Sequence, residues 1–364
     1  MAKSYATQAT KPQKASPLPP PSPTWYPAAM GTGILGTLLQ IHHEYVPGAQ
    51  IVARIALIVG WLVLTSLTAG FLIRIARSRK ALWSTFRDSN QCAMWGTVSM
   101  GFLAVGSATA TVVPAWFTSL THLAWSVNVV LWIIGTTIGV VAALLFAMRL
   151  VGSDLGAPTT VWGLAVVGPM VSSTTGAALV PHIGNAEARV WLLVGTVACF
   201  FLSLCVGTVI FAVAYHHHWR ISPVALAASC SSWIPLGMVG QSTAAAQAMA
   251  SQAITMVDDS TAHAVQQMAN LYGLGMFCVG VPLVLWATIT TVRGFLRRMP
   301  FSPGWWALTF PIGTLSLGAH NLGAGTGVGF FTALGVIANL VLFGTVCFCL
   351  CCSLVMIKRR GMAF

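Results

Sequence analysis

Charged side chains are scarce in this sequence, and acidic ones are the scarcest. Only 7% of the 364 residues are charged and six are acidic, whereas 56% are hydrophobic. So few ionisable groups cannot solvate the surface of a soluble protein of this length, which excludes a soluble fold. The apolar stretches also lack the alternating pattern of strands, and a membrane admits only helices or closed barrels. We therefore expect an all-α membrane protein.

Apolar runs long enough to cross a membrane recur along the chain. A helix needs about 20 residues to cross a hydrocarbon core of about 30 Å. Ten runs approach that length: 26–41, 51–77, 91–112, 121–148, 161–181, 190–214, 222–250, 267–292, 304–323 and 328–356. This predicts a ten-helix transmembrane domain, 26–356, between a disordered cytoplasmic N-terminal tail, 1–25, and a basic cytoplasmic C-terminal tail, 357–364.

The basic residues are strongly biased in position. Every Lys and Arg except Arg54 and Arg189 lies in the N-terminal tail, after an even-numbered span, or at the C-terminus. Because cytoplasmic segments carry the excess of positive charge, this predicts a multi-pass protein of the cell (inner) membrane with both termini cytoplasmic. The net charge of +12 is therefore a topology signal and predicts no nucleic-acid partner.

Glycine and proline interrupt the odd-numbered spans, whereas the even-numbered spans are mostly aliphatic. Pro169, Pro235 and Pro311 are expected to kink the fifth, seventh and ninth spans, since proline removes an N–H donor and clashes with the preceding turn. Irregular backbone at membrane depth persists only inside protein or beside a water-filled cavity. The odd spans are therefore expected to surround a central path, and the even spans to face lipid. Alternatively, the small residues only let helices pack closely.

Uncharged polar residues gather in the same odd-numbered spans. The residues expected to line the path are Thr32, Gly33, Thr97, Ser99, Ser173, Thr174, Gln241, Ser242, Thr314 and Ser316. No Asp, Glu, Lys or Arg falls at mid-membrane depth, where an ionisable residue would mark a functional site. A relay of buried carboxylates is therefore not expected. An anion would instead be stabilised by hydroxyl groups and helix N–H dipoles and attracted by the basic mouth.

Phe310 precedes Pro311 in the segment Trp305–Gly313. The residue before a proline is pushed away from the α region, and a large ring at such a bend can close a pore by dewetting. The alternative is a core Phe packed against its neighbours. His320 and Asn321, near the far end of the same span, are expected to shape an outer vestibule together with Arg54. Arg54 alternatively snorkels to the membrane interface.

Three segments carry a family resemblance: Met30–Gly33, Trp233–Gly240 and Trp305–Gly313. With the order of spans over residues 24–356, they resemble the tellurite-resistance/dicarboxylate transporter family, which includes malate permeases and plant slow anion channels. The resemblance implies five helical hairpins, a quasi-fivefold inner ring of kinked helices around a pore, and usually a homotrimer. It also implies that Phe310 is the residue that occludes the pore.

The resemblance and the uncharged lining together predict transport of small anions across the bilayer. The expected activity is export of C4-dicarboxylates or similar organic acids through a pore gated by Phe310. The alternative is a channel or efflux protein for an inorganic anion such as sulfite, tellurite or chloride.

Other motifs lack the context that their chemistry needs. Gly31–Gly36 matches the dinucleotide fingerprint in form but follows no strand. The run His216–His218 is typical of a solvated loop, although it is also a candidate for metal binding or pH sensing. No catalytic set, metal ligand set or cofactor is predicted, so we do not expect an enzyme. An intramembrane enzyme acting on lipid-linked substrates is the alternative from another class, and a haem protein is a third possibility.

Overall fold

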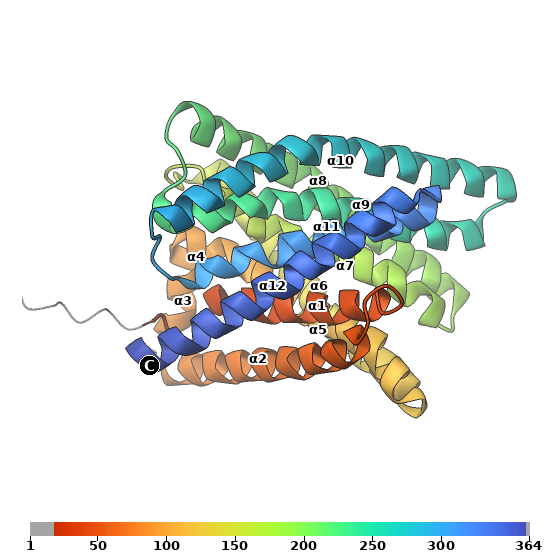
Figure 1. Ribbon diagram of the computed structural model, residues 1–364, viewed down its shortest axis with the longest axis horizontal. Coiled ribbons are helices and arrows are strands. Elements are labelled where there is room, and N and C mark those ends of the chain that lie inside the picture. The colour runs from red at the N-terminus through yellow and green to blue at the C-terminus, as the bar shows by residue number, and fades with distance from the viewer. Residues whose placement is uncertain (1–17, 362–364) are drawn as a thin grey trace, which may run out of the picture.

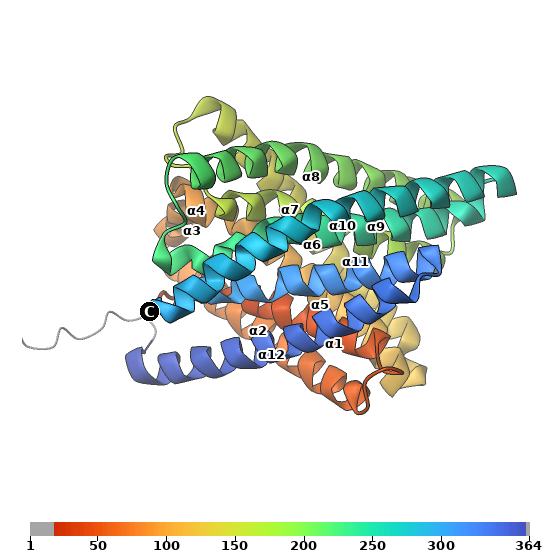
Figure 2. The ribbon, with the colours of Figure 1, turned by 45° about the horizontal axis from the view of Figure 1, so that its top comes forward.

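A computed structural model describes residues 18–361, and within that range the chain is helical with no strand. The helices are α1 (Pro27–Ile41), α2 (Ala49–Arg77), α3 (Arg79–Arg87), α4 (Ser89–Ala93), α5 (Trp95–Trp116), α6 (Thr121–Gly152), α7 (Leu164–Leu179), α8 (Ala186–Arg220), α9 (Ile234–Ala253), α10 (Asp259–Leu296), α11 (Phe310–Thr326) and α12 (Gly329–Arg360). The long helices run side by side along the length of the molecule (Figures 1 and 2). The prediction of an all-α protein is confirmed for these residues.

Burial divides the long helices into two sets. The apolar window of α7 is 94% buried and that of α5 is 67% buried, whereas the corresponding windows of α2, α6, α8, α10 and α12 are only 17–39% buried. The residues of α1, α9 and α11 are mostly buried as well. Because an exposed apolar helix face requires lipid, the second set is the outer one. We call α1, α5, α7, α9 and α11 the inner helices.

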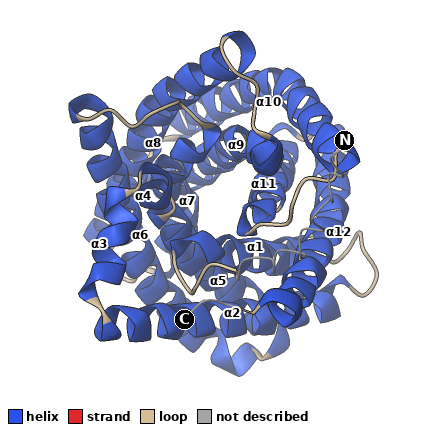
Figure 3. Cartoon of the chain, turned by 90° about the vertical axis from the view of Figure 1, so that its left-hand side faces the viewer, coloured by secondary structure: helices blue, strands red, loops and turns tan. Residues whose placement is uncertain are grey.

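The inner helices form a closed ring. Each packs against two others in the order α1, α5, α7, α9, α11 and back to α1, as the view along the bundle shows (Figure 3). Glycine permits these contacts: a Cβ on Gly33 would lie 2.7 Å from the Ala104 backbone of α5, and one on Gly240 would lie 2.3 Å from the backbone of α11. The close-packing interpretation therefore holds for these glycines, and the packing they allow closes the ring.

Seven helical stretches within residues 18–361 are long and apolar enough to span a membrane, which makes the chain a multi-pass membrane protein. These stretches contain α2, α5, α6, α7, α8, α10 and α12. The three other predicted spans correspond to α1, α9 and α11, which do not qualify by length and hydropathy. Short 3-10 segments extend the beginning of each: η1 (Pro23–Trp25), η5 (Leu226–Trp233) and η7 (Pro303–Leu308).

The prolines act differently from the predicted kinks. Pro169 lies inside α7, but Pro235 and Pro311 are the second residues of α9 and α11, which begin shortly after the 3-10 segments η5 and η7. A missing N–H is harmless in the first turn, where that donor has no partner within the helix. Pro235 and Pro311 therefore begin helices and do not kink them, which corrects the prediction for these two residues.

The packed part of the chain is longer at both ends than the predicted domain. Residues 1–17, most of the predicted N-terminal tail, lie outside the described residues, as do 362–364. Leu18 and Trp25, however, are buried, and the Leu18 N–H donates to the Gly361 carbonyl over 3.0 Å. The last turn of α12 includes Lys358–Arg360, which is helical and not a separate tail.

One end of the bundle collects the basic residues. The outer helices α2, α6, α8 and α10 each carry Arg in the last turn, at Arg74, Arg149, Arg220 and Arg293, and α12 ends in Lys358–Arg360. The short helices α3 and α4 lie at the same end (left in Figure 1). We call this the basic end. The inner helices run in the opposite direction, so they begin here and finish at the far end.

Candidate functional site

A cavity of about 180 Å³ lies inside the ring, and every inner helix contributes to its lining. Its residues are Ile34, Thr37 and Ile41 of α1; Ala104, Ser107 and Thr111 of α5; Val171, Thr174, Thr175 and Ala178 of α7; Gln241 and Ala248 of α9; and Phe310, Leu317 and Asn321 of α11. On four of the helices the spacings are three, four or seven residues, and on α7 the adjacent Thr174 and Thr175 lie between Val171 and Ala178, so a single face of each helix points inward. We call this space the axial cavity.

The axial cavity carries no fixed charge, and most of the surface that lines it is apolar. Its lining includes the hydroxyls of Thr37, Ser107, Thr111 and Thr175 and no Asp, Glu, Lys, Arg or His. The volume of the axial cavity is several times the roughly 30 Å³ that a water occupies in the liquid.

Two amides connect α9 to its neighbours at the cavity wall. Nε2 of Gln241 donates to the Thr174 hydroxyl of α7 over 2.8 Å, and Nδ2 of Asn321 donates to the Ala244 carbonyl of α9 over 3.4 Å. Oε1 of Gln241 is buried and has no hydrogen-bond partner within residues 18–361. Because an amide turned by half a rotation would accept from Thr174 through Oε1, Gln241 can present either a carbonyl oxygen or an N–H₂ group to a solute.

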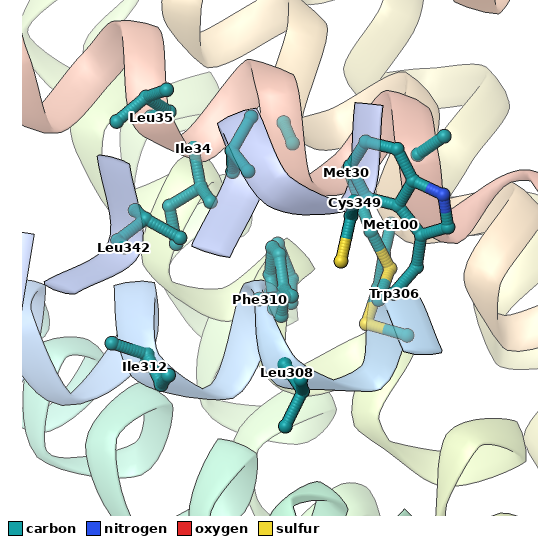
Figure 4. Close-up of a cluster of buried hydrophobic side chains, with 14 of the residues drawn as sticks. Met30, Ile34, Leu35, Met100, Trp306, Leu308, Phe310, Ile312, Leu342 and Cys349 are labelled. Atoms are coloured by element: carbon teal, nitrogen blue, oxygen red, sulfur yellow. The ribbon is translucent and has the colours of Figure 1, made fainter. Parts of the chain in front are cut away.

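Phe310 lies at the end of the cavity nearer the basic end. It is the first residue of α11, whereas Ile41 and Ala178, in the last turns of α1 and α7, mark the opposite end. Phe310 is only 3% exposed. Phe310 belongs to an apolar cluster with Met30 and Met100, and Figure 4 shows it between these residues and Ile34. The axial cavity therefore ends at an aromatic ring that packs with other apolar side chains.

Four of the predicted site residues line the axial cavity: Phe310, Thr174, Gln241 and Asn321. Eight others predicted to line the path are not among its lining residues: Thr32, Gly33, Thr97, Ser99, Ser173, Ser242, Thr314 and Ser316. Ser99 and Ser316 illustrate this, because their hydroxyls donate to carbonyls of outer helices, at Gly135 over 2.6 Å and Gly335 over 2.7 Å. Thr97 likewise donates to the Pro23 carbonyl over 2.9 Å. A polar side chain in an inner helix can form its hydrogen bond with an outer helix. Composition alone therefore does not reveal which face of the inner helix the side chain occupies.

Several lining hydroxyls were not predicted: Thr37, Ser107, Thr111 and Thr175. The signal that identifies them is the repeat at helical spacing. Thr37 follows Ile34 by three residues and precedes Ile41 by four, and Thr111 follows Ser107 by four. A projection of each odd span onto a helix would have placed Ser107 with Thr111, and Thr174 with Thr175, on one face of their own helix.

The residues predicted to form an outer vestibule have separate roles. Only Asn321 lines the axial cavity. The guanidinium carbon of Arg54 lies 5.3 Å from the centroid of the Trp116 ring, which is cation–π geometry. His320 packs edge to face against His42, the residue after α1, with 4.9 Å between ring centroids. His42 is fully buried, and neither of its ring nitrogens has a partner within residues 18–361.

The His42 environment predicts acid sensitivity. Burial, and secondarily the neighbouring His320 imidazole, lowers the pKa of His42 from 6.5 to about 4. Between these values the unfolded chain binds more protons than the folded one, so stability falls as the pH is lowered through this window. We expect His42→Phe to flatten the fall in melting temperature between pH 7 and 4.5, measured in detergent by intrinsic fluorescence. His43→Gln, at the adjacent exposed histidine, should leave the slope unchanged, and an equal slope in the His42 variant would contradict this assignment.

No group of three or more His, Cys, Asp or Glu side chains within residues 18–361 is arranged to hold a metal ion.

Comparisons with known proteins agree with this geometry. Residues 21–354 match the model of the voltage-dependent anion channel family, SLAC1. The chain is 24% identical to a sulfite efflux pump of Arthroderma otae over 338 residues, which cover 88% of this chain and 86% of the pump. It is 25% identical to a sulfite efflux pump of Arthroderma benhamiae, again with 88% and 86% covered, and 24% identical to an uncharacterized transporter of Methanocaldococcus jannaschii, with 82% of each chain covered. These relatives are transporters, and the resemblance in the three short segments is confirmed over nearly the whole sequence. With its ring of inner helices and uncharged axial cavity, the chain belongs to the voltage-dependent anion channel family of anion transport proteins.

Proposed function

We propose that this protein moves small inorganic anions, with sulfite in its singly charged form as the best candidate, through the axial cavity. The observation that carries the proposal is the lining itself: α1, α5 and α7 supply hydroxyls, and α9 and α11 supply one amide each, in a small and otherwise apolar space without a fixed charge. The naming of two relatives as sulfite efflux pumps supports the choice of anion. The path would follow the axis of the ring of inner helices. In this proposal α1, α9 and α11 cross the membrane beside the seven longer stretches. The domain then has ten spans, and its five inner helices are arranged with quasi-fivefold symmetry.

The preference for a singly charged anion follows from the free-energy cost of removing the anion from water. Burying an ion without an opposite charge is costly, and the cost rises steeply with its charge. Neutral donors such as Gln241 and Ser107 can replace part of the hydration shell of a monoanion, but no guanidinium or ammonium group in the lining offsets a second negative charge. A C4-dicarboxylate, the substrate expected from sequence, would enter as a larger dianion. The lining therefore favours hydrogensulfite over malate or succinate.

The charge distribution favours export. If the basic end faces the cytoplasm of the cell, the Arg and Lys residues there raise the local concentration of anions before they reach Phe310. Both described ends of the chain, Leu18 and Gly361, lie together at this end, which agrees with two cytoplasmic termini. Phe310 would act as the gate between this mouth and the axial cavity. Assembly as a homotrimer, which the family resemblance implies, remains part of this proposal.

Proteoliposomes loaded with sulfite or malate test the substrate. We expect the purified protein to release sulfite about tenfold faster than malate, a barrier difference of about 1.4 kcal/mol. Sulfite release should also accelerate as the pH is lowered and the singly charged form becomes more abundant. Protein-free vesicles provide the background rate.

Equal or faster release of malate would contradict the preference for an inorganic monoanion. Release of cations without any anion would overturn anion transport itself.

A further inference from the structure

A second cavity, of about 240 Å³, lies at the basic end on the outside of the ring. It is formed by the last turn of α8, the segment that leads into η5, and the final turns of α10, and it shares no lining residue with the axial cavity. Its polar lining consists of His218, Ser229, Thr290, Arg293 and Arg297, with Trp286 beside them. No carboxylate lines it. We call it the peripheral cavity.

The two guanidinium groups reach the peripheral cavity from the last turn of α10 and from Arg297, the residue directly after its end. Trp286, Thr290, Arg293 and Arg297 are separated by four, three and four residues, which places them along a single helical stripe. Arg293 and Arg297 are exposed and one turn apart. A guanidinium presents several N–H donors in a plane that matches the oxygens of a phosphate group. The pair is therefore suited to an anion with several oxygens.

His218 adds a third possible donor. Its Nδ1 bonds to the Ser222 carbonyl over 3.2 Å, and its Nε2 is buried without a partner within residues 18–361. Because a carbonyl only accepts, Nδ1 carries the hydrogen, and Nε2 gains one only when the ring is charged. An anion in the peripheral cavity would favour this charged form and so obtain a further N–H donor.

The surface next to the peripheral cavity is apolar and faces outward. On α10, Leu285, Ile289, Val292 and Leu296 are 59%, 68%, 50% and 80% exposed, and Trp219 at the end of α8 is 55% exposed. Such side chains contact acyl chains in a membrane, and Trp favours the level of the headgroups. A free anion would use only the basic residues, whereas a phospholipid would fill the basic cavity and cover the apolar face together.

We propose that the peripheral cavity binds the phosphate headgroup of an anionic phospholipid from the leaflet at the basic end. Basic pockets between transmembrane helices are suited to such headgroups. The bound lipid would hold α8, η5 and α10 together at their ends without entering the axial cavity.

Native mass spectrometry of the purified full chain tests the proposal, with phosphatidic acid and phosphatidylcholine of identical acyl chains as probes. We expect phosphatidic acid to bind more tightly than phosphatidylcholine. Arg293→Gln should weaken its binding about fivefold, and Arg293→Gln with Arg297→Gln about thirtyfold. The matched control, Lys358→Gln with Arg359→Gln, removes two exposed cations from α12 at the same end and should leave binding unchanged. Circular dichroism verifies that each variant is folded.

Three results would overturn the proposal. One is equal binding of the two lipids, and another is an unchanged affinity in the folded Arg293 and Arg297 double variant. The third is displacement of the lipid by millimolar inorganic phosphate, because the site would then recognise a free anion and make no use of the apolar face.

Discussion

A Phe310→Ala variant is expected to transport anions about tenfold faster than the unmodified protein, equivalent to a barrier lowered by about 1.4 kcal/mol. Phe310 lines the axial cavity at the side of the basic end and belongs to the same apolar cluster as Met30 and Met100. An apolar constriction excludes water and ions together, so removing its largest ring lets water enter and lowers the barrier. Anion flux from proteoliposomes measures the effect, and Phe310→Leu should give a smaller increase.

The control for this variant separates a gate from a damaged core. Replacing a packed Phe by Ala commonly costs about 3–5 kcal/mol, and a loosened protein can leak. Phe146 is fully buried beside Trp162, with 6.0 Å between ring centroids, and lies outside the axial cavity. Phe146→Ala should lower the melting temperature without increasing flux. Equal leakage from both variants, or an unchanged rate in folded Phe310→Ala, would remove Phe310 as the gate.

A Gln241→Leu variant is expected to lose most of its anion transport. Gln241 is 1% exposed, lines the axial cavity and is the amide that can turn an N–H₂ group toward a solute. A hydrogen bond to a charged partner contributes about 1.5–3 kcal/mol, so the rate should fall about tenfold to a hundredfold. Gln241→Glu keeps the size but adds a negative charge, and it should reduce anion flux even further because like charges repel inside the small cavity.

Gln247 provides a matched control on the same helix. Its Nε2 donates to Oδ1 of Asn270 over 3.0 Å, and the side chain is buried but does not line the axial cavity. Gln247→Leu should therefore change stability and leave the ratio of sulfite to malate transport intact. If Gln247→Leu reduced anion flux as much as Gln241→Leu, the effect would reflect general loss of structure, and the role assigned to Gln241 would be wrong.

The class of the protein and the division of its helices into inner and outer sets could be predicted from the sequence because both depend on local composition. Each apolar run requires lipid or protein around it whatever the other runs do. The glycine- and proline-rich odd spans proved to be the buried ones, with α7 the clearest case. The order Phe310–Pro311 also indicated an irregular backbone at this point, although the proline lies in the first turn of α11 and does not bend a helix.

The rotation of each inner helix about its own axis could be decided only by the tertiary structure. Ser99, Ser316 and Thr174 look alike in sequence, yet the first two bond to outer helices and only Thr174 faces the axial cavity. Contacts such as Gly33 against α5 and Gly240 against α11 fix these rotations, and they arise between segments far apart in the chain. Composition therefore determined a membrane bundle with polar inner helices, and the packing of all neighbours at once determined which of their side chains an anion would meet.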